Sequence, residues 1–441
     1  LFRQIVHDDL GCASYLIGDE GAGVGAVVDP RLDIDEYLRL ARYSGVHIEH
    51  ILETHNHADH VSGHGRLAGD TGAPIHVSAD AGVAYEHVPL SDGSVINVGN
   101  ASITALATPG HRPEHLSYLV ADARRSEEPW LVVTGDSLFI GDLARPDLAV
   151  EPEEGARGLF RSVARLLQLE DFAEAWPGHV GGSLCGGAGM SEKPGSTIGF
   201  ERRFNRSLGV ADEDEFVAAA IRTGVRPANM ERIVELNRGP FVGSPAPLEP
   251  LDGGGGLILD VRAAEDFLAG HARGALNVPV DGGNFPTKAG FVLPPDERVA
   301  IHAASEEQAQ RAARGLQAVG IFDLAGYVVG PPAEERLTPV ELEELHSLVE
   351  AGEVDVLDVR EPHERDRGYI PGSRNIPYRL VREWAQDLQG GKPVVTICSS
   401  GPRAGIAASV LASTGVDARP VLHGGVEDWG GETVSFRRCG T

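Results

Sequence analysis

The chain has 441 residues, more than one hydrophobic core usually organises, so two to four domains are expected. It carries 38 basic and 65 acidic side chains, and its net charge of −27 opposes binding to nucleic acid or anionic membranes. No apolar run approaches the roughly 18 to 20 residues that span a bilayer.

Cysteine usage points to a reducing compartment. The four cysteines, Cys12, Cys185, Cys398 and Cys439, are too few and too scattered for a disulfide framework. The residues from Leu1 onward show no signal-peptide pattern. We therefore expect a cytoplasmic protein.

The first 120 residues alternate short apolar runs with glycine-rich turns, which is typical of an α/β fold. Apolar runs predict strands at 14–18, 25–28, 48–52, 74–77, 95–98 and 103–107, and later at 130–133. Apolar side chains at helical spacing predict a helix over 33–44, and a second helix is expected at 64–71.

A dense group of ligand-type side chains follows the strand at 48–52. His55, His57, Asp59 and His60 fall within six residues. Imidazole and carboxylate suit a transition metal such as zinc or iron. A solvated loop that happens to be rich in histidine is the alternative, but partners later in the chain argue against it.

Those partners stand where other predicted strands end. His111 follows 103–107, Asp136 follows 130–133, and His179 follows a short apolar segment at 175–177. Layered α/β folds assemble sites from loops on one sheet edge, so these side chains are expected to converge. The sequence therefore predicts a metal site.

The order of these residues resembles the metallo-β-lactamase superfamily, whose HxHxDH motif stands intact at 55–60. The resemblance covers about 1–185 and implies an αβ/βα sandwich. The segments 53–60, 108–111, 134–139 and 142–147 look most like persulfide dioxygenases, and hydroxyacylglutathione hydrolases of the glyoxalase II type are the nearest competitors.

The resemblance to persulfide dioxygenases implies one Fe(II) per chain, held by His55, His111 and Asp136. Two imidazoles and one carboxylate leave positions open for substrate and dioxygen. The remaining members of the cluster would orient the ligands and hydrogen-bond to bound oxygen species; these are His57, Asp59, His60 and His179. The hydrolases hold two zinc ions instead, and residue identity alone does not distinguish one metal from two.

Three neighbours of the cluster have alternative roles. His115 is expected to be structural, although it lies near enough to His111 to face the same cavity. Arg145 resembles an arginine that binds a substrate carboxylate. The alternative is that Arg145 forms an ion pair at the surface. Cys185 is expected to line the site. The alternative is that it is a buried, inert thiol. Other histidines are interpreted as structural: His7, His47, His50, His64, His76 and His87.

The segment 190–243 resembles the helical extension of bacterial persulfide dioxygenases that are fused to rhodaneses. Glycine and proline then crowd 240–256, which predicts a domain boundary. Beyond it, 257–262 recurs as 355–360 and 274–279 recurs as 372–377, which indicates a duplicated domain. We therefore predict domains at 1–245, 246–333 and 334–441, with Pro331-Pro332 separating the copies.

The second copy places Cys398 on a short loop between a strand at 394–397 and a helix at 404–411. Backbone N–H groups and a helix N-terminus stabilise a thiolate there, and Arg403 adds positive charge. A buried structural cysteine is the alternative. The loop, with 358–361, 368–373 and 423–429, resembles the rhodanese sulfurtransferases, which are doubly wound α/β domains that carry a cysteine persulfide.

In the first copy His302 stands where Cys398 stands in the second. Histidine does not carry a persulfide, and Glu306 and Glu307 would repel an anionic donor. This copy therefore resembles an inactive rhodanese, expected to act as a spacer or docking surface, with a regulatory ligand site as the alternative.

Together these features predict a persulfide dioxygenase fused to a sulfurtransferase. It would convert a low-molecular-weight thiol persulfide, such as glutathione persulfide, and O2 to sulfite and thiol, and Cys398 would move sulfane sulfur between thiosulfate or sulfite and thiol. The alternatives are a binuclear zinc thioester hydrolase fused to a sulfurtransferase, and a persulfide carrier or sensor with little turnover. We expect a homo-oligomer with small-molecule partners and neither nucleic acid nor membrane.

Overall fold

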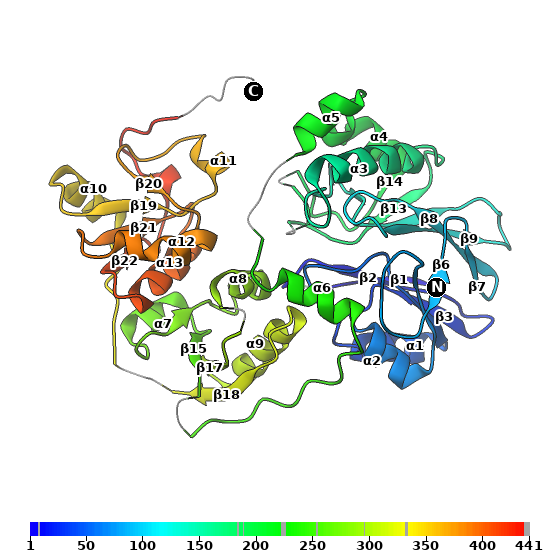
Figure 1. Ribbon diagram of the computed structural model, residues 1–441, viewed down its shortest axis with the longest axis horizontal. Coiled ribbons are helices and arrows are strands. Elements are labelled where there is room, and N and C mark those ends of the chain that lie inside the picture. Colours follow the sequence, from blue (N-terminus) through cyan, green and yellow to red (C-terminus); the bar gives the residue numbers. More distant parts are fainter. Residues whose placement is uncertain are drawn as a thin grey trace. The chain divides into compact units, whose positions relative to one another are not determined.

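A computed structural model describes residues 1–441 except 8, 183–184, 188, 222–225, 253–254, 295, 331–333 and 436–441. It divides into two compact units (Figure 1). Unit 1 comprises Leu1–Gly224, Asn229–Pro245 and Ala318–Gly320, and unit 2 comprises Val225–Ala228, Ala246–Gln317 and Ile321–Thr441. Among the described residues, no helix has the length and apolarity to cross a membrane.

Unit 1 is built on two six-stranded sheets. The first has the order β1-β2-β3-β4-β5-β6, with strands β1 Phe2–Val6, β2 Ala13–Asp19, β3 Val24–Val28, β4 His47–Leu52, β5 Ile75–Ser78 and β6 Val88–Leu90. The second has the order β14-β13-β10-β9-β8-β7, with strands β7 Val95–Val98, β8 Ala101–Ala107, β9 Leu116–Asp122, β10 Leu131–Gly135, β13 Glu174–Pro177 and β14 Ser196–Thr197. A small hairpin joins β11 Leu138–Phe139 to β12 Asp142–Leu143.

Alternating side chains explain how these sheets pack. Tyr15 and Ile17 of β2 enter the core shared by the two sheets, whereas Leu16 enters the core beneath the outer helices. Likewise Leu131 and Val133 of β10 enter the shared core. The result is a helix–sheet–sheet–helix sandwich (Figure 1). Its helices are α1 Asp35–Ser44, α2 His64–Thr71, α3 Pro152–Leu166, α4 Ile198–Phe204, η1 Arg206–Leu208, α5 Glu213–Ala220 and α6 Met230–Arg238.

Unit 2 contains two four-stranded parallel sheets, one for each copy of the duplication. The first has the order β16-β15-β17-β18, with strands β15 Leu257–Asp260, β16 Leu276–Asn277, β17 Val299–Ala303 and β18 Leu324–Val329. The second has the order β20-β19-β21-β22, with strands β19 Asp355–Asp358, β20 Arg374–Asn375, β21 Val394–Ile397 and β22 Ala418–Pro420. The equivalent strand orders establish the duplication in space.

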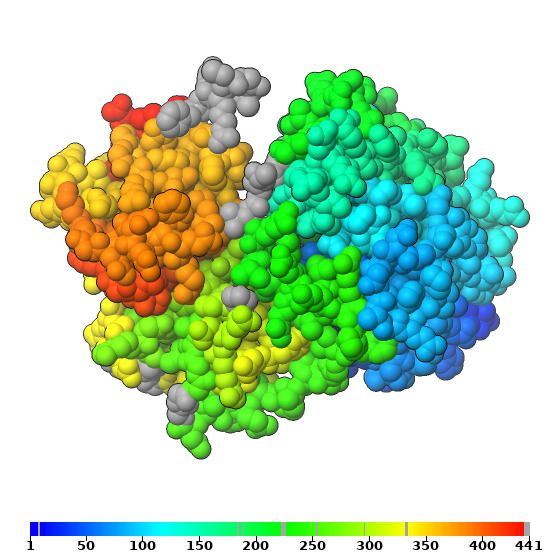
Figure 2. All heavy atoms as spheres, viewed as in Figure 1, coloured from blue at the N-terminus to red at the C-terminus, as the bar shows by residue number. Residues whose placement is uncertain are grey.

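Helices cover both sheets of unit 2, as parallel sheets require. The first copy has α7 Ala264–Ala269, α8 Phe285–Val292 and α9 Glu306–Ala318. The second has α10 Leu342–Glu350, α11 Pro362–Arg365, η2 Tyr378–Leu380, α12 Val381–Trp384, η3 Ala385–Leu388, α13 Pro402–Ser413 and η4 Val426–Asp428. One hydrophobic core contains residues of both copies, whose described atoms are coloured from green through yellow to red in Figure 2.

The predicted elements are present with shifted ends. The helix predicted at 33–44 begins at Asp35, and the helix predicted at 404–411 extends over Pro402–Ser413 because proline fits a first helical turn. The predicted separator Pro331-Pro332 lies outside the described residues. The domain limits 1–245, 246–333 and 334–441 stay predictions.

Candidate metal centre and cysteine loop

The histidine cluster lies on the loop that leaves β4, and hydrogen bonds from other strands hold this loop. The backbone N–H and hydroxyl of Thr54 donate to the Asp29 carboxylate at 2.7 and 2.8 Å. The Tyr118 hydroxyl donates to the Glu53 carbonyl at 2.6 Å. Both anchors are buried, so the loop enters the site in a fixed conformation.

Three buried ligand atoms converge on one point of this site. His111 Nε2 lies 3.6 Å from Asp136 Oδ2, and His55 Nε2 lies 4.0 Å from the same oxygen. None of the three atoms has a hydrogen-bond partner. Buried polar atoms without partners are costly, and a metal ion bound by all three would satisfy them together. The donor set therefore fits a metal ion.

The other nitrogen of each histidine ligand is already engaged. His55 Nδ1 lies 2.9 Å from the Thr54 hydroxyl, and His111 Nδ1 lies 3.0 Å from the Arg145 carbonyl. Such contacts fix the ring orientation and leave Nε2 facing the metal position. Burial lowers the pKa of both imidazoles, which keeps them neutral as ligands must be.

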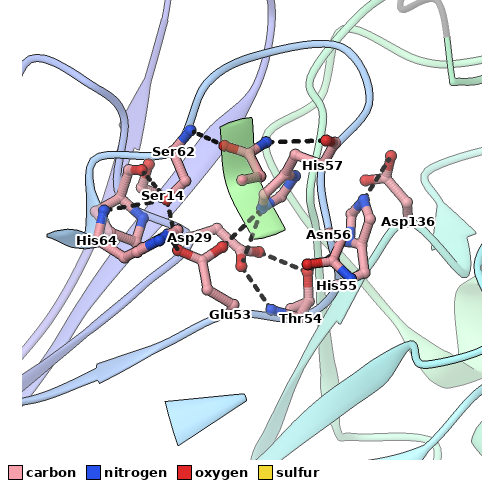
Figure 3. Close-up of polar contacts among 12 residues, drawn as sticks. Ser14, Asp29, Glu53, Thr54, His55, Asn56, His57, Ser62, His64 and Asp136 are labelled. Atoms are coloured by element: carbon pink, nitrogen blue, oxygen red, sulfur yellow. Dashed lines mark hydrogen bonds and ion pairs between the residues drawn. The ribbon is translucent and has the colours of Figure 1, made fainter. Parts of the chain in front are cut away.

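His57 instead lies against two carboxylates. Its Nε2 is 3.1 Å from Glu53 Oε2 and 3.3 Å from Asp29 Oδ1, and Figure 3 shows the ring directed at them. Burial lowers the pKa of His57, but Asp29 and Glu53 outweigh it and raise the pKa well above its ordinary value. The two carboxylates therefore favour the protonated, cationic form of the buried ring.

Asp59, His60 and His179 form a second group beside the first. The His179 ring bridges two carboxylates, with Nε2 2.8 Å from Asp59 Oδ2 and Nδ1 3.1 Å from Asp136 Oδ1. His60 Nδ1 lies 3.1 Å from Asp59 Oδ1, and its Nε2 has no hydrogen-bond partner. Both His179 nitrogens are thus occupied by carboxylates.

His115 supports two of the three ligands. It stacks on His55 with 5.1 Å between ring centroids, and its Nε2 accepts the Asp136 backbone N–H at 2.9 Å. Burial lowers the pKa of His115 to about 3, so the ring stays neutral and accepts this bond. His115 is therefore structural, as predicted, and faces the cluster as well.

Arg145 and Cys185 both lie near the cluster. The Arg145 guanidinium donates to both oxygens of Asp147 at 2.9 and 2.7 Å. Cys185 is fully buried, and its sulfur lies within 4.8 Å of a possible ligand atom of Asp59 and of His179. Burial and then the charges of Asp59 and Asp136 raise the pKa of its thiol. Their roles in binding substrate stay predictions.

In unit 2, Cys398 leaves β21 and lies at the start of α13. The Gly401 backbone N–H donates to its sulfur at 3.1 Å. The loop needs glycine there because φ is +102° and a Cβ would approach the Leu422 carbonyl oxygen to 1.8 Å. Arg403 donates to both oxygens of Glu364 at 2.6 and 2.8 Å and to the Ser399 hydroxyl at 2.8 Å.

The equivalent loop of the first copy is closed. His302 lies 2.9 Å from Asp260 Oδ2 through Nδ1 and 2.5 Å from the Gly330 carbonyl oxygen through Nε2. The Ala304 backbone N–H donates to the Gln308 side chain at 2.8 Å. A ligand therefore finds neither an open nitrogen on His302 nor a free N–H at Ala304.

Comparisons with known families agree with this architecture. A model of the metallo-beta-lactamase superfamily matches residues 7–179, and a model of the rhodanese-like domain matches 247–330 and 341–432. A solved metallo-beta-lactamase from Staphylococcus aureus subsp. aureus COL is 31% identical with a TM-score of 0.70, covering 75% of this chain and 99% of that chain. The chain belongs to the metallo-β-lactamase superfamily. It carries two rhodanese-like domains in addition, as predicted.

The curated relatives match less than half of this chain. A probable metallo-hydrolase of Burkholderia pseudomallei is 31% identical over 46% of this chain and 80% of its own length. A hydroxyacylglutathione hydrolase of Pseudomonas entomophila is 32% identical over 37% of this chain and 60% of its own length. The chain spans about half the length of a beta-lactamase hydrolase-like protein of Xylella fastidiosa, which is 28% identical over 47% of this chain.

The sequence did not single out several residues that shape the two sites. Asp29 comes 26 residues before His55, and only the fold brings it to His57. Glu364 similarly reaches Arg403 from α11. Glu53 adjoins the motif, and its spacing of four residues from His57 is the one signal that was available. His50 and His76 were interpreted as structural, and His50 Nδ1 lies 3.0 Å from His76 Nε2 between β4 and β5, a contact that the sequence did not indicate.

Proposed function

We propose that the lactamase-fold domain is a mononuclear Fe(II) persulfide dioxygenase and that Cys398 makes the second rhodanese-like domain a sulfurtransferase. The proposal rests on one observation. Three ligand atoms without hydrogen-bond partners, one each from His55, His111 and Asp136, converge on one point. His57, which a binuclear site would use as a ligand, lies against Asp29 and Glu53 instead. Two imidazoles and one carboxylate form the triad typical of non-haem Fe(II) oxygenases.

The proposed oxidation converts a thiol persulfide, RSSH, with O2 and H2O into RSH, sulfite and two protons. Bound Fe(II) would supply the redox chemistry with dioxygen. The chain's own residues hold the ligands: Thr54 and the Arg145 carbonyl orient the two imidazoles, and His115 fixes the Asp136 backbone. His60, whose Nε2 has no hydrogen-bond partner, is available to exchange a proton in this reaction.

The proposed sulfur transfer uses Cys398 as nucleophile. Its thiolate attacks the sulfane sulfur of thiosulfate, the S–S bond of thiosulfate breaks, and sulfite leaves with the electron pair. The resulting cysteine persulfide passes its outer sulfur to a low-molecular-weight thiol such as glutathione. The Gly401 N–H and the α13 N-terminus stabilise the negative sulfur. Each activity then forms a substrate of the other.

A binuclear zinc thioester hydrolase is the second candidate for the lactamase-fold domain. It is favoured by the likeness to a hydroxyacylglutathione hydrolase and by a second buried group of possible ligands, His57, Asp59 and His60, whose ligand atoms lie within 4.8 Å of one another. A second metal held by His57 would draw its Nε2 away from Glu53 and Asp29, and one held by His179 would require that ring to give up a carboxylate contact at 2.8 or 3.1 Å. We therefore rank it below the mononuclear enzyme.

Two assays on the full chain separate the candidates. Iron-loaded protein is expected to consume oxygen with glutathione persulfide, to form sulfite, and to lose this activity in His111→Ala. Zinc-loaded protein is expected to leave S-lactoylglutathione intact. Rapid hydrolysis of that thioester without persulfide-dependent oxygen uptake would overturn the proposal. Slow turnover in every assay, with a stable persulfide on Cys398, would favour a carrier or sensor instead.

A further inference from the structure

The turn at residues 111–115 supports two of the three proposed ligands within five residues. His111 is one of these ligands, and His115 Nε2 accepts the backbone N–H of Asp136, which is another. The third, His55, lies on a different loop, the one that leaves β4. The distance between His55 and His111 therefore depends on contacts that join this loop to the turn.

Glu114, on the turn, makes those contacts. Its Oε1 accepts the backbone N–H of Asn56 at 3.1 Å and the Asn56 side-chain amide at 2.9 Å. The Asn56 N–H belongs to the peptide unit that follows His55, so the carboxylate holds the backbone of a proposed ligand. The Asn56 amide also donates to the Ala81 carbonyl at 2.8 Å. Glu114 and Asn56 are 1% and 3% exposed.

The Glu114 carboxylate is itself held in place. The Arg112 Nε atom donates to the same Oε1 at 3.2 Å, and Arg112 is buried as well. Hydrogen bonds between charged groups are stronger than neutral ones, and this pair is shielded from solvent. The start of the turn is fixed by α3, where the Ser162 hydroxyl donates to the Pro109 carbonyl at 2.6 Å. The turn therefore offers Glu114 from a rigid position.

We infer that Glu114 is a positioning residue of the metal centre, which sets the distance between His55 and His111 before a metal binds. This inference rests on the proposed function, whose metal centre it concerns. Glu114 belongs to none of the groups of possible ligands among the described residues, because its Oε1 serves Asn56 and Arg112. Partners that hold ligands in place raise metal affinity, since less ordering remains to be done when the metal binds.

The chain offers a matched control at Asp19, which makes the same kinds of contact elsewhere. Asp19 Oδ2 accepts the backbone N–H of Asn100 at 2.8 Å and its side-chain amide at 2.6 Å, and Arg124 lies 3.5 Å from Oδ1. Asp19 ends β2, whereas Cys12, which pairs with His179, precedes the start of that strand. Extended chain of this length places Asp19 roughly 20 Å from Cys12.

Metal affinity, measured by chelator competition for Zn(II) on the full chain, tests the inference. Glu114→Ala is expected to weaken the affinity about tenfold or more, as removal of a group that orients metal ligands does. Asp19→Ala should stay within about twofold of the unmodified chain. Glu114→Gln should stay within about threefold, because its amide oxygen can accept the same bonds. Equal affinities in Glu114→Ala and Asp19→Ala would overturn the inference, as would equal losses in Glu114→Ala and Glu114→Gln.

A second variant tests the contact from the other loop. Asn56→Ala should also weaken metal binding, and its loss and that of Glu114→Ala, summed as free energies, should exceed the loss in the double variant. Additive losses would contradict the contact. These measurements need no turnover, so they are independent of the proposed reaction. Metal affinity that depends on Glu114, in a chain that consumes no oxygen with persulfide, would retain the inference and reject the dioxygenase.

Discussion

His55 and His57 stand two residues apart in one motif, yet their side chains have different surroundings. The Nε2 atoms of both rings lack a hydrogen-bond partner, but that of His55 faces Asp136, whereas that of His57 lies within ion-pair distance of Glu53 and Asp29. The sequence predicted that these side chains converge, as they do, and the resemblance implied His55 as a direct ligand, which stays a prediction. The acidic partners of His57 depend on tertiary contacts, so spacing alone did not predict its ion pairs.

Replacing His57 tests its ion pairs with Asp29 and Glu53. His57→Gln is expected to lower the free energy of unfolding by about 3–5 kcal/mol, because it leaves two buried carboxylates without a cation. Metal content should stay at that of the unmodified chain. Urea unfolding and metal analysis measure both, with exposed His47→Gln as control. Loss of one of two bound metals in His57→Gln would identify His57 as a ligand.

Replacing Cys398 should separate the two activities. Cys398→Ser is expected to abolish thiosulfate-to-thiol transfer, because a hydroxyl does not form a persulfide, and to leave persulfide-dependent oxygen uptake within twofold. A stopped-time assay of sulfite release under anaerobic conditions and an oxygen electrode measure the two rates. Transfer that survives in Cys398→Ser would show that another group carries the sulfur.

At the scale of elements, the hydrophobic patterns predicted most strands and helices because each strand divides its side chains between two cores. Their ends were less predictable. The α13 helix begins at Pro402, directly after Gly401, whose positive φ closes the cysteine loop. Pairing between α11 and this loop, through Glu364 and Arg403, was not predictable because it joins segments almost 40 residues apart.

The loop conformation at Gly401 is open to a direct test. Gly401→Ala is expected to destabilise the domain by at least about 1–3 kcal/mol, through strain at φ +102° and a clash with the Leu422 carbonyl, and to abolish sulfur transfer. Gly390→Ala has φ +73° and no neighbour within 4 Å, so it should cost less. Calorimetry on both variants measures the difference in stability. Equal losses of stability in Gly401→Ala and Gly390→Ala would show that the cysteine loop does not depend on glycine at position 401.

The ion pair between Glu364 and Arg403 predicts a pH dependence. Burial raises the pKa of Glu364, but bonds from Arg403 outweigh it and lower the pKa from 4.5 to about 2. The pair therefore stabilises the fold fully above pH 4.5, and this contribution disappears as pH falls towards 2. Compared with Glu364→Gln, the unmodified chain should lose stability across that window. Thermal unfolding from pH 6 to 2 measures it, and a difference independent of pH would contradict the pairing.

For the whole molecule, the repeat at 257–262 and 355–360 predicted the duplication, and the family models confirm two rhodanese-like domains. The sequence also indicated that the first copy lacks the reactive cysteine. The contacts between the two copies were not predictable, because the edge-on packing of Phe291 on Tyr378 joins segments far apart in the sequence.

The central claim is that the histidine cluster binds one metal ion and not two. Metal per chain, measured by mass spectrometry after anaerobic saturation of separate samples with Fe(II) and Zn(II) and removal of excess, tests it most directly. We predict one ion per chain with either metal and almost none in His111→Ala, because His111 supplies one of three converging ligand atoms. Two ions per chain at saturation would contradict the account.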